Sequence, residues 1–375
     1  MAGFSIDRPA GDTAEAQAKV TPGAIKTQRL GVVGLGGMAM AHIEGLLKLE
    51  GMAISAICDV QRSALDEVGE RLGIPSERRH TDYSGLIADE AVDAVVSVTP
   101  NALHAEVMRL CLLAGKPFLS EKPFTRTFEE AEELNALFAT HPVPAMIGFS
   151  YRYTPAFRLV KRMLDENRIG AVRSFSIQYL QGWGAAVYKT PYVWRFDRNV
   201  TGTGTLGDLG AHMIDLAHYL FGAFEELSAR LQTLIPERAD PRTGEMTAVE
   251  VDDFASFQSL MTNGAAGLFQ TTRNAIGSGN QLEVSIFGDE GTLMASTERP
   301  EEIAWIRVDA ETGELVRETR RSPQSERLNQ WQDFAAMLAG APGPGLPDFA
   351  VGYENQRVLE AIVRSHEEKR TISLR

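Results

Sequence analysis

Through the first 150 residues, short apolar runs alternate with segments whose apolar residues recur at helical spacing. We predict buried strands at the apolar runs, which are residues 29–33, 52–58, 92–98, 117–120 and 144–149, with a shorter strand near 80–82. The segments between them predict helices over residues 40–49, 62–72, 83–89, 102–114 and 128–140. Strands and helices that alternate at these lengths are typical of an α/β protein with a doubly wound Rossmann sheet.

Beyond about residue 150 the pattern changes, because strand-like runs follow one another with few helices between them. The runs are residues 171–180, 227–234, 249–260, 265–272, 281–287, 292–295 and 303–308, and helices are predicted over 155–167, 206–220, 327–338 and 352–368. Consecutive strands favour a large, mostly antiparallel open sheet in an α+β domain. We therefore expect a mobile tail over residues 1–28, a Rossmann domain over residues 29–150 and an α+β domain over residues 151–375.

The first predicted strand runs into a glycine turn and then a helix, with the pattern G-x-G-x-x-A over residues 34–39. Gly34 permits a tight turn, and Gly36, followed by Gly37 and Met38, lets the backbone approach a pyrophosphate closely. The N-terminus of the next helix offers free N–H groups and a positive dipole end to phosphates. The glycine pattern alone is a weak signal, but the strand, turn and helix together predict a dinucleotide-binding site.

A carboxylate at the end of the second strand indicates which dinucleotide is bound. Asp59 lies about 20 residues beyond the glycine turn, where an acidic side chain accepts hydrogen bonds from the adenosine ribose. The same charge would repel the 2′-phosphate of NADP, so we expect NAD as the cofactor. Arg62 lies close to Asp59 in the sequence and weakens this preference.

The composition narrows the classes of partner. A net charge of −13 argues against nucleic acid and anionic membranes, and no apolar stretch is long enough to span a membrane. The N-terminus lacks the pattern of a signal peptide, and the two cysteines, Cys58 and Cys111, fit buried thiols better than a disulfide or a zinc site. We therefore expect a cytoplasmic protein that acts on a small molecule.

Two further polar segments follow predicted strands, at the carboxyl edge where cofactors lie. The strand over 92–98 is followed by Thr99, Pro100, Asn101 and His104, and the strand over 117–120 is followed by Glu121, Lys122 and Pro123. We expect both segments to contact the cofactor. The alternatives are a proline turn with an asparagine helix cap for the first segment and a solvated salt pair for the second. The Lys122–Pro123 bond is also a candidate cis peptide.

A glycine-rich segment begins at residue 202 and leads into the predicted helix of residues 206–220. At 100° per residue, Asp208, His212 and Asp215 share one face of that helix. Three interpretations stay open, namely a metal site, a buried His–Asp network and a proton-transfer site that faces the nicotinamide. We favour proton transfer and expect no metal, because no second acid/His motif completes a ligand shell. With His212 as the base, oxidation should quicken as the pH rises through the usual imidazole range.

These motifs resemble those of the Gfo/Idh/MocA family of NAD(P)-dependent oxidoreductases, over about residues 29–374. The likeness rests on G-L-G-G-M-A (34–39), V-D-A-V-V-S-V-T-P-N-A-L-H (92–104), A-G-K-P-F-L-S-E-K-P (114–123) and G-T-G-T-L-G-D-L-G-A-H-M-I-D (202–215). The resemblance implies that Lys122 is a catalytic lysine beside the nicotinamide, with Asp208 and His212 as its partners in proton transfer. It also implies a homo-oligomer, a tetramer or a dimer, and the many strands after residue 225 agree because an open sheet needs a second cover.

Within the family, Trp194-Arg195-Phe196 followed by G-T-G-T-L-G-D looks most like levoglucosan and inositol dehydrogenases. This likeness implies that Asp208 and His212 touch a polyol together with Tyr151, Tyr153, Arg195 and, as a further candidate, Gln178. The implied reaction is hydride transfer between NAD and a secondary hydroxyl of a sugar, sugar derivative or cyclic polyol. Two alternatives stay open, which are a glycosidase that works through transient C3 oxidation and a non-catalytic NAD(P)-bound regulator.

Overall fold

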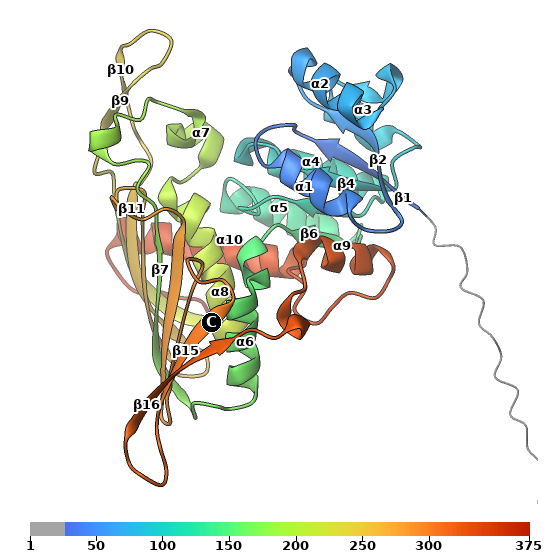
Figure 1. The fold of residues 1–375 in the computed structure, drawn as a ribbon. Coiled ribbons are helices and arrows are strands. Elements are labelled where there is room, and N and C mark those ends of the chain that lie inside the picture. Colours follow the sequence, from blue (N-terminus) through green and yellow to red (C-terminus); the bar gives the residue numbers. More distant parts are fainter. Residues whose placement is uncertain (1–26) are drawn as a thin grey trace, which may run out of the picture.

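The computed structural model describes residues 27–375, which form two sheets with helices packed on them (Figure 1). The first sheet and its helices, blue to cyan in Figure 1, lie beside a larger sheet built from later parts of the chain. The predicted N-terminal tail lies outside the described residues apart from Thr27 and Gln28, and Gln28 already belongs to the first strand. The division of the chain near residue 150 stays a prediction.

All six strands of the first sheet are parallel, in the order β3-β2-β1-β4-β5-β6. The strands are β1 (Gln28–Val33), β2 (Met52–Cys58), β3 (Arg79–His80), β4 (Ala94–Ser97), β5 (Phe118–Ser120) and β6 (Ala145–Ile147). The helices between them are α1 (Ala39–Leu47), α2 (Arg62–Leu72), α3 (Tyr83–Ala88), α4 (Asn101–Ala114) and α5 (Phe128–Phe138). This is the predicted Rossmann sheet, and its order reverses between β1 and β4, where such sheets bind ligands beyond their carboxyl ends.

The second sheet has nine strands, in the order β16-β15-β14-β13-β7-β12-β11-β8-β17. The strands are β7 (Val172–Leu180), β8 (Phe224–Gln232), β11 (Phe254–Met261), β12 (Ala266–Thr272), β13 (Gln281–Gly288), β14 (Thr292–Ser296), β15 (Glu302–Val308), β16 (Leu315–Arg321) and β17 (Ile372–Ser373). Strands β7 and β12 pair in parallel, and the other described pairs of this sheet are antiparallel. The predicted mostly antiparallel sheet is therefore confirmed.

Four strands are not predicted by the hydrophobic pattern. Strands β9 (Glu237–Ala239) and β10 (Met246–Ala248) form a separate hairpin, and β17 has two residues, so all three are too short to show a period. Strand β16 forms an edge of the large sheet and buries none of its residues, so it carries no apolar alternation. A strand that contributes nothing to the core leaves no hydrophobic signal in the sequence.

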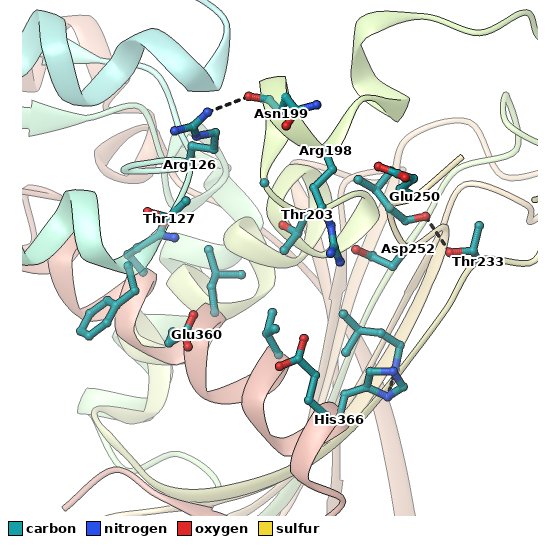
Figure 2. A pocket seen from close by; sticks show the side chains of 18 of the residues that line it. Arg126, Thr127, Arg198, Asn199, Thr203, Thr233, Glu250, Asp252, Glu360 and His366 are labelled. Atoms are coloured by element: carbon teal, nitrogen blue, oxygen red, sulfur yellow. Dashed lines mark hydrogen bonds between the residues drawn. The ribbon is translucent and has the colours of Figure 1, made fainter. Parts of the chain in front are cut away.

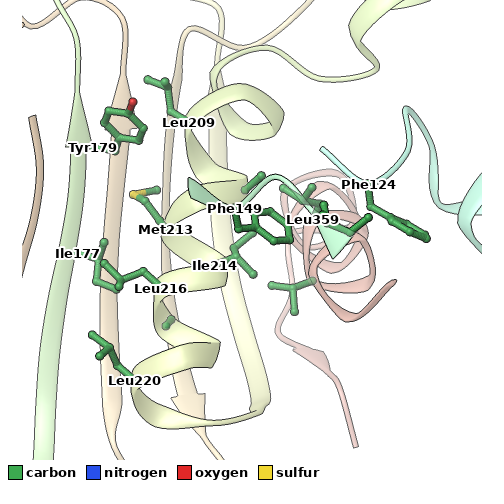
Figure 3. Close-up of a cluster of buried hydrophobic side chains, with 14 of the residues drawn as sticks. Phe124, Phe149, Ile177, Tyr179, Leu209, Met213, Ile214, Leu216, Leu220 and Leu359 are labelled. Atoms are coloured by element: carbon green, nitrogen blue, oxygen red, sulfur yellow. The ribbon is translucent and has the colours of Figure 1, made fainter. Parts of the chain in front are cut away.

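Helices α6 (Pro155–Asp165), α8 (Ala211–Phe221) and α10 (Phe349–Glu368) lie on the face of the large sheet that is turned toward the Rossmann sheet (Figure 1). Helix α8 is apolar on opposite sides. Figure 3 shows Met213 and Leu216 on the side of Ile177, a residue of β7, and Ile214 on the side of Phe149. Because α8 is buried on both sides, it cannot shift without disturbing the core, and it provides a rigid support for the polar residues at its N-terminal end.

The C-terminal region returns to the Rossmann sheet before it ends on the large sheet. Helix α9 (Gln330–Leu338) packs against α1 so closely that a Cβ at Gly45 would overlap the ring of Trp331. Phe334 and Met337 of α9 join the apolar cluster around β1. Helix α10 then leads to β17, which pairs with β8 of the large sheet. The end of the chain thus ties the two sheets together.

Candidate active site

The glycine turn after β1 leaves its backbone open to a ligand. Gly34 has a φ of +86°, and a Cβ there would press on the carbonyl of Val98, so glycine is required. A Cβ at Gly36 or Gly37 would meet no atom within 4 Å, so both glycines border open space. Met38 is exposed beside them, and no side chain caps α1, so the positive end of this helix is open to a phosphate. These features fit the pyrophosphate of a dinucleotide.

Asp59 is held at the end of β2 by backbone N–H groups. Its Oδ2 accepts a hydrogen bond from the N–H of Leu35 at 2.8 Å, and its Oδ1 accepts one from the N–H of Gln61 at 2.8 Å. Because Leu35 belongs to the glycine turn, the first bond fixes the carboxylate beside the open turn. Each oxygen keeps a lone pair for a ribose hydroxyl. Arg62 lies exposed at the start of α2.

The four residues predicted at the end of β4 have different surroundings. The amide of Asn101 donates to the carbonyl of Thr201 at 3.2 Å, which connects this edge to the second half of the chain. His104 is fully buried, and its ring nitrogens lie 2.7 Å from the carbonyl oxygen of Pro123 and 2.9 Å from that of Thr99. Burial lowers the pKa of His104. The structure thus places His104 behind the two turns, without surface for a cofactor, while Thr99 and Pro100 keep exposed surface.

Glu121 is a carboxylate with two fixed partners. Its Oε1 lies 2.9 Å from Nε2 of His42, and its Oε2 accepts from the backbone N–H of Lys122 at 3.2 Å. The indole of Trp331 donates to Nδ1 of His42 at 3.3 Å, so Nε2 carries the proton that faces Glu121. Burial alone would raise the pKa of Glu121, but the bond from His42 and the charge of Lys122 lower it to about 2. The bond between Lys122 and Pro123 is cis, as the sequence suggests.

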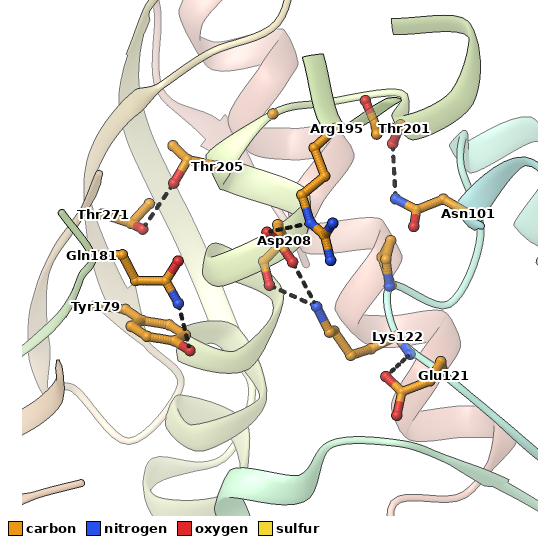
Figure 4. A network of polar contacts seen from close by, with 12 residues as sticks. Asn101, Glu121, Lys122, Tyr179, Gln181, Arg195, Thr201, Thr205, Asp208 and Thr271 are labelled. Carbon is orange, nitrogen blue, oxygen red and sulfur yellow. Dashed lines mark hydrogen bonds and ion pairs between the residues drawn. The ribbon is translucent and has the colours of Figure 1, made fainter. Parts of the chain in front are cut away.

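Lys122 and Asp208 form an ion pair that joins the Rossmann edge to the start of α8 (Figure 4). The ammonium of Lys122 donates to Oδ1 of Asp208 at 2.9 Å and to its carbonyl oxygen at 3.0 Å. Arg273 donates to Oδ2 of Asp208 at 2.8 Å, and Nε of Arg195 lies 3.8 Å from the same oxygen. Burial alone would raise the pKa of Asp208, but these three cations hold it well below its usual range. Asp208 is therefore a permanent anion and no proton acceptor.

His212 lies one turn further along, in α8, and is 6% exposed. Its ring centroid is 4.6 Å from that of Tyr151, and its Nδ1 has no hydrogen-bond partner among the described residues. Burial and the charge of Lys122 lower the pKa of His212 to about 3. The imidazole is therefore neutral at physiological pH, and the same shift makes it a weaker base than an ordinary histidine. Since it is neutral well below pH 6.5, the predicted rise in rate through the usual imidazole range cannot come from His212.

The prediction that Asp208, His212 and Asp215 share one helix face assumes a regular helix throughout. Asp208 lies in a π-helical turn (Leu206–Gly210) that precedes α8, and the rotation of 100° per residue does not hold across such a turn. Asp215 is buried and pairs with the guanidinium of Arg152. In the part of the chain that the structure describes, no three or more His, Cys, Asp or Glu side chains come together in a way that could hold a metal ion.

The two predicted tyrosines lie on one short helix (Ser150–Tyr153) but point to different places. Tyr151 lies beside His212, and its hydroxyl is 2.7 Å from the hydroxyl of Tyr179. Tyr153 is buried with the residues of the Rossmann core and donates to Asp333 at 2.6 Å. The structure therefore brings Tyr151 to the predicted site and leaves Tyr153 in a structural position.

Gln178 also lies away from the predicted site. It stands in β7 between the buried residues Ile177 and Tyr179, and neighbouring residues of a strand point to opposite faces, so Gln178 faces the open side of the sheet. Tyr179 and Gln181 lie near Asp208 instead (Figure 4). Their side chains both bond Oδ1 of Asn280, at 2.6 Å from Tyr179 and 2.8 Å from Gln181. The alternation of polar and apolar residues over 174–179 places Gln178 on the polar face of the strand, so the sequence held a signal against it.

Arg273 is the charged residue of the site that the sequence does not reveal. It follows β12, is 1% exposed and contacts Asp208 across a separation of 65 residues. Its surroundings in the sequence, T-T-R-N, match no motif. We refer below to Lys122, Arg195, Asp208, His212 and Arg273 as the polar cluster.

A cavity of about 750 Å³, whose lining side chains are drawn in Figure 2, includes no residue of the polar cluster. It is bordered by the turn at Arg126 and Thr127, by residues of α7 (Arg198–Thr201) and by α10. Gly202 and Thr203, which precede the π-helical turn, also line it, but Lys122, Asp208 and His212 do not. The predicted catalytic residues therefore do not open into this cavity.

Comparison with known proteins agrees with this arrangement. The model of the oxidoreductase family with an NAD-binding Rossmann fold matches residues 28–149, and the model of the Gfo/Idh/MocA C-terminal domain matches residues 157–294. The fold and the open glycine turn define an NAD(P)-binding oxidoreductase. The chain belongs to the Gfo/Idh/MocA family. No helix within residues 27–375 has the length and apolar character to cross a membrane.

Two curated relatives and one solved structure illustrate the likeness. Levoglucosan dehydrogenase of Pseudarthrobacter phenanthrenivorans is 32% identical over 373 residues, which cover 90% of this chain and 95% of the relative. The NADP(+)-dependent scyllo-inositol 2-dehydrogenase of Bacillus subtilis is 27% identical over 365 residues, which cover 93% of this chain and 97% of the relative. The structure of a levoglucosan dehydrogenase in complex with NADH and levoglucosan has a TM-score of 0.86 at 29% identity, covering 93% of this chain and all of that one.

Proposed function

We propose that the protein is an NAD-dependent dehydrogenase of a sugar, sugar derivative or cyclic polyol. It transfers a hydride between a secondary hydroxyl and the nicotinamide. The observation that carries the proposal is the ion pair of Lys122 and Asp208 at 2.9 Å, with His212 in the helix turn that follows Asp208. Lys122 and Asp208 lie where the carboxyl edge of the Rossmann sheet meets the start of α8 (Figure 4), and His212 is the second residue of α8.

The cofactor side of the site is formed by the glycine turn and the strand ends. Gly36, Gly37 and the N-terminal end of α1 would hold the pyrophosphate, and Asp59 would hold the adenosine ribose. Residues that would flank the nicotinamide are Thr99, Pro100, Asn101, Glu121 and Lys122. When bound, the nicotinamide supplies a hydride acceptor at C4. Asp59 favours NAD, because a carboxylate at this place repels a 2′-phosphate.

The polar cluster is suited to remove a proton from a hydroxyl group. His212 accepts the hydroxyl proton, since its imidazole is neutral at physiological pH. Three cations surround the single carboxylate of Asp208, so the cluster has an excess of positive charge. This excess stabilises the alkoxide that forms as the proton leaves, and Lys122 is the cation that lies at the Rossmann edge.

The neighbouring side chains are suited to bind a polyhydroxylated substrate. The hydroxyls of Tyr151 and Tyr179 and the amides of Gln181 and Asn280 form one hydrogen-bonded group next to His212. Arg195 adds a planar donor fork, which suits vicinal hydroxyls. The names of the relatives, levoglucosan dehydrogenase and scyllo-inositol 2-dehydrogenase, point to the same class of substrate.

The uncovered face of the large sheet supports assembly into a homo-oligomer, which we propose to be a tetramer or a dimer. Phe287 and Met294 are exposed on the adjacent strands β13 and β14, and Leu268 is exposed on β12, beyond β7. Their strand neighbours Phe269, Ile286 and Leu293 are buried on the other face. Exposed apolar residues on a sheet face are typical of a surface that is covered by a partner. Sedimentation should show more than one subunit at micromolar concentration, and a stable monomer would contradict the proposal.

A screen for NADH absorbance tests the proposed reaction. The purified protein is mixed with NAD and, in separate wells, with inositols, aldoses, anhydrosugars and glycosides. We expect NADH to form with at least one substrate in the first three groups. Cleavage of an aryl glycoside without net NADH would indicate the glycosidase alternative, and no turnover of any substrate despite tight NADH binding would indicate a regulator.

A further inference from the structure

Arg273 contacts Asp208 with one of its three guanidinium nitrogens. Its NH2 group donates to Oδ2 of Asp208 at 2.8 Å and to the carbonyl of Gly204 at 3.3 Å. Its Nε and NH1 are buried without a hydrogen-bond partner among the described residues. Burying a guanidinium with two unpaired nitrogens costs free energy of folding. The ion pair with Asp208 is the contact that offsets this cost.

The same guanidinium is enclosed by the loop of residues 182–196, which follows β7. It lies 5.2 Å from the ring centroid of Trp183 and 5.9 Å from that of Phe196. The backbone of Arg273 is bonded to this loop as well, because the N–H of Gly184 donates to its carbonyl at 2.9 Å. A Cβ at Gly184 would lie 2.8 Å from the Cβ of Arg273, so the loop passes directly over this residue. The loop also carries Arg195 of the polar cluster.

A second buried arginine holds the same loop without touching Asp208. Arg238, from β9, donates to the carbonyls of Gly184 and Thr190 at 2.6 and 3.1 Å and lies 4.3 Å from the ring centroid of Phe196. Phe196 thus contacts two guanidinium groups, of which Arg273 alone reaches the catalytic carboxylate. Comparing variants of the two arginines can therefore separate the holding of the loop from the contact with Asp208.

We propose that Arg273 is a positioning residue that holds the carboxylate of Asp208 toward Lys122 and couples it to the loop of residues 182–196. The proposal rests on the proposed function, since Asp208 is taken as part of the catalytic group. Arg273 donates to Oδ2 of Asp208, which Arg195 approaches only to 3.8 Å, and leaves Oδ1 for Lys122. If the loop moves when a substrate binds, Arg273 transmits that movement to Asp208.

A double-mutant cycle with Asp208 tests whether Arg273 acts through that carboxylate. Displacing a catalytic group by about 1 Å costs about 10²-fold in rate, so Arg273→Met should lower kcat by about that factor. In the Asp208→Asn background the same substitution should cause little further loss, because its target is already gone. Arg273→Lys, which keeps the charge and loses the planar fork, should recover part of kcat. A kcat for Arg273→Met within twofold of the parent, or an equal loss in both backgrounds, would overturn the proposal.

Two control variants separate positioning from general packing. Arg238→Met loosens the loop on its other side and should raise KM for the polyol while kcat stays within about twofold. Arg173→Met removes an exposed Arg–Asp pair at the sheet surface and should change neither constant. A fall in kcat for Arg238→Met as large as that for Arg273→Met would also overturn the proposal, because the loop alone would then explain it.

A urea-unfolding cycle of the same four Arg273 and Asp208 variants needs no substrate. The two substitutions should be non-additive in the free energy of unfolding, since each removes the same contact. Should Arg273→Met fail to fold, Arg273→Lys takes its place in both cycles, and an additive loss would again overturn the proposal. If the parent turns over no polyol, the proposed function fails, while additivity in the urea cycle decides separately whether Arg273 holds Asp208.

Discussion

The cofactor edge and the polar cluster meet at Lys122, but they are built in different ways. On the cofactor side, the site is formed mainly by backbone groups at strand ends. Each motif there spans a few residues, as in the glycine turn and at Asp59. In the polar cluster, charged side chains arrive from separate segments, and Asp208 is paired with cations 86 and 65 residues away. The first region depends on local chain geometry, and the second depends on how the two sheets are docked.

This difference has a chemical counterpart. The cofactor edge presents N–H groups and a helix end, which suit phosphates of fixed charge. The polar cluster presents three cations around one carboxylate and a neutral imidazole, which suit a group whose charge develops during the reaction. If the two regions are separable, substitutions in the polar cluster should leave cofactor binding unchanged. Substitutions at the cofactor edge should likewise leave KM for the polyol unchanged.

The largest effect should come from removing the proton-transfer groups. Lys122→Met and His212→Ala should lower kcat by about 10²–10⁴-fold, the usual loss for a positioned proton-transfer group. Both variants should bind NADH nearly as tightly as the parent in a fluorescence titration, because the phosphates and the adenosine are held elsewhere. If His212→Ala kept more than about a tenth of the parental kcat, well inside that expected loss, the acid–base role would be wrong.

The next effect concerns the cofactor edge alone. The parent should prefer NAD over NADP by about tenfold or more in kcat/KM, a difference of about 1.4 kcal/mol. Asp59→Ala should reduce this preference by weakening NAD binding and removing the repulsion of a 2′-phosphate, with KM for the polyol unchanged. Arg62→Ala is the matched control, since loss of the nearby cation should strengthen the preference for NAD. A parent that favours NADP tenfold would refute the assignment.

The same difference explains what the sequence could predict. Gly34, Asp59 and Glu121 could be predicted because each follows a parallel strand. Parallel strands bring their carboxyl ends to one edge of the sheet, so predicting the strands also predicts where these residues lie. Arg273 and Asn280 were not, because their contacts depend on the register of β12 and β13 with β7, which no local pattern encodes. The π-helical turn at Asp208 was not predicted either, because the pattern assumes a regular helix from residue 206 to residue 220.

A smaller effect is expected at the edge of the polar cluster. Arg195 lies 4.4 Å from the ring centroid of Trp194, is partly exposed and reaches Asp208 at 3.8 Å. Arg195→Ala should raise KM for the polyol about tenfold, as expected for the loss of hydrogen bonds from a charged donor, and lower kcat less. Arg198→Ala is the control, because Arg198 borders the separate cavity. An unchanged KM for Arg195→Ala would assign Arg195 to structure.

The smallest effect should come from the second layer of the cofactor edge, where α9 supports α1. Phenylalanine at position 331 keeps the packing of Trp331 on Gly45 but removes the donor to Nδ1 of His42. Nδ1 can then take the proton, and Nε2 would present a lone pair to Glu121, which weakens their bond.

We therefore expect Trp331→Phe to cost about 1 kcal/mol in the free energy of unfolding, as for the loss of one buried hydrogen bond. KM for NAD should rise a few-fold, and KM for the polyol should stay the same. Trp194→Phe is the mirror control, since Trp194 lies beside Arg195 on the substrate side and should change only the KM for the polyol. If Trp331→Phe changed KM for the polyol and left KM for NAD unchanged, the cofactor edge and the polar cluster would not be separable. Residues 330–338 would then support the polar cluster rather than the cofactor edge.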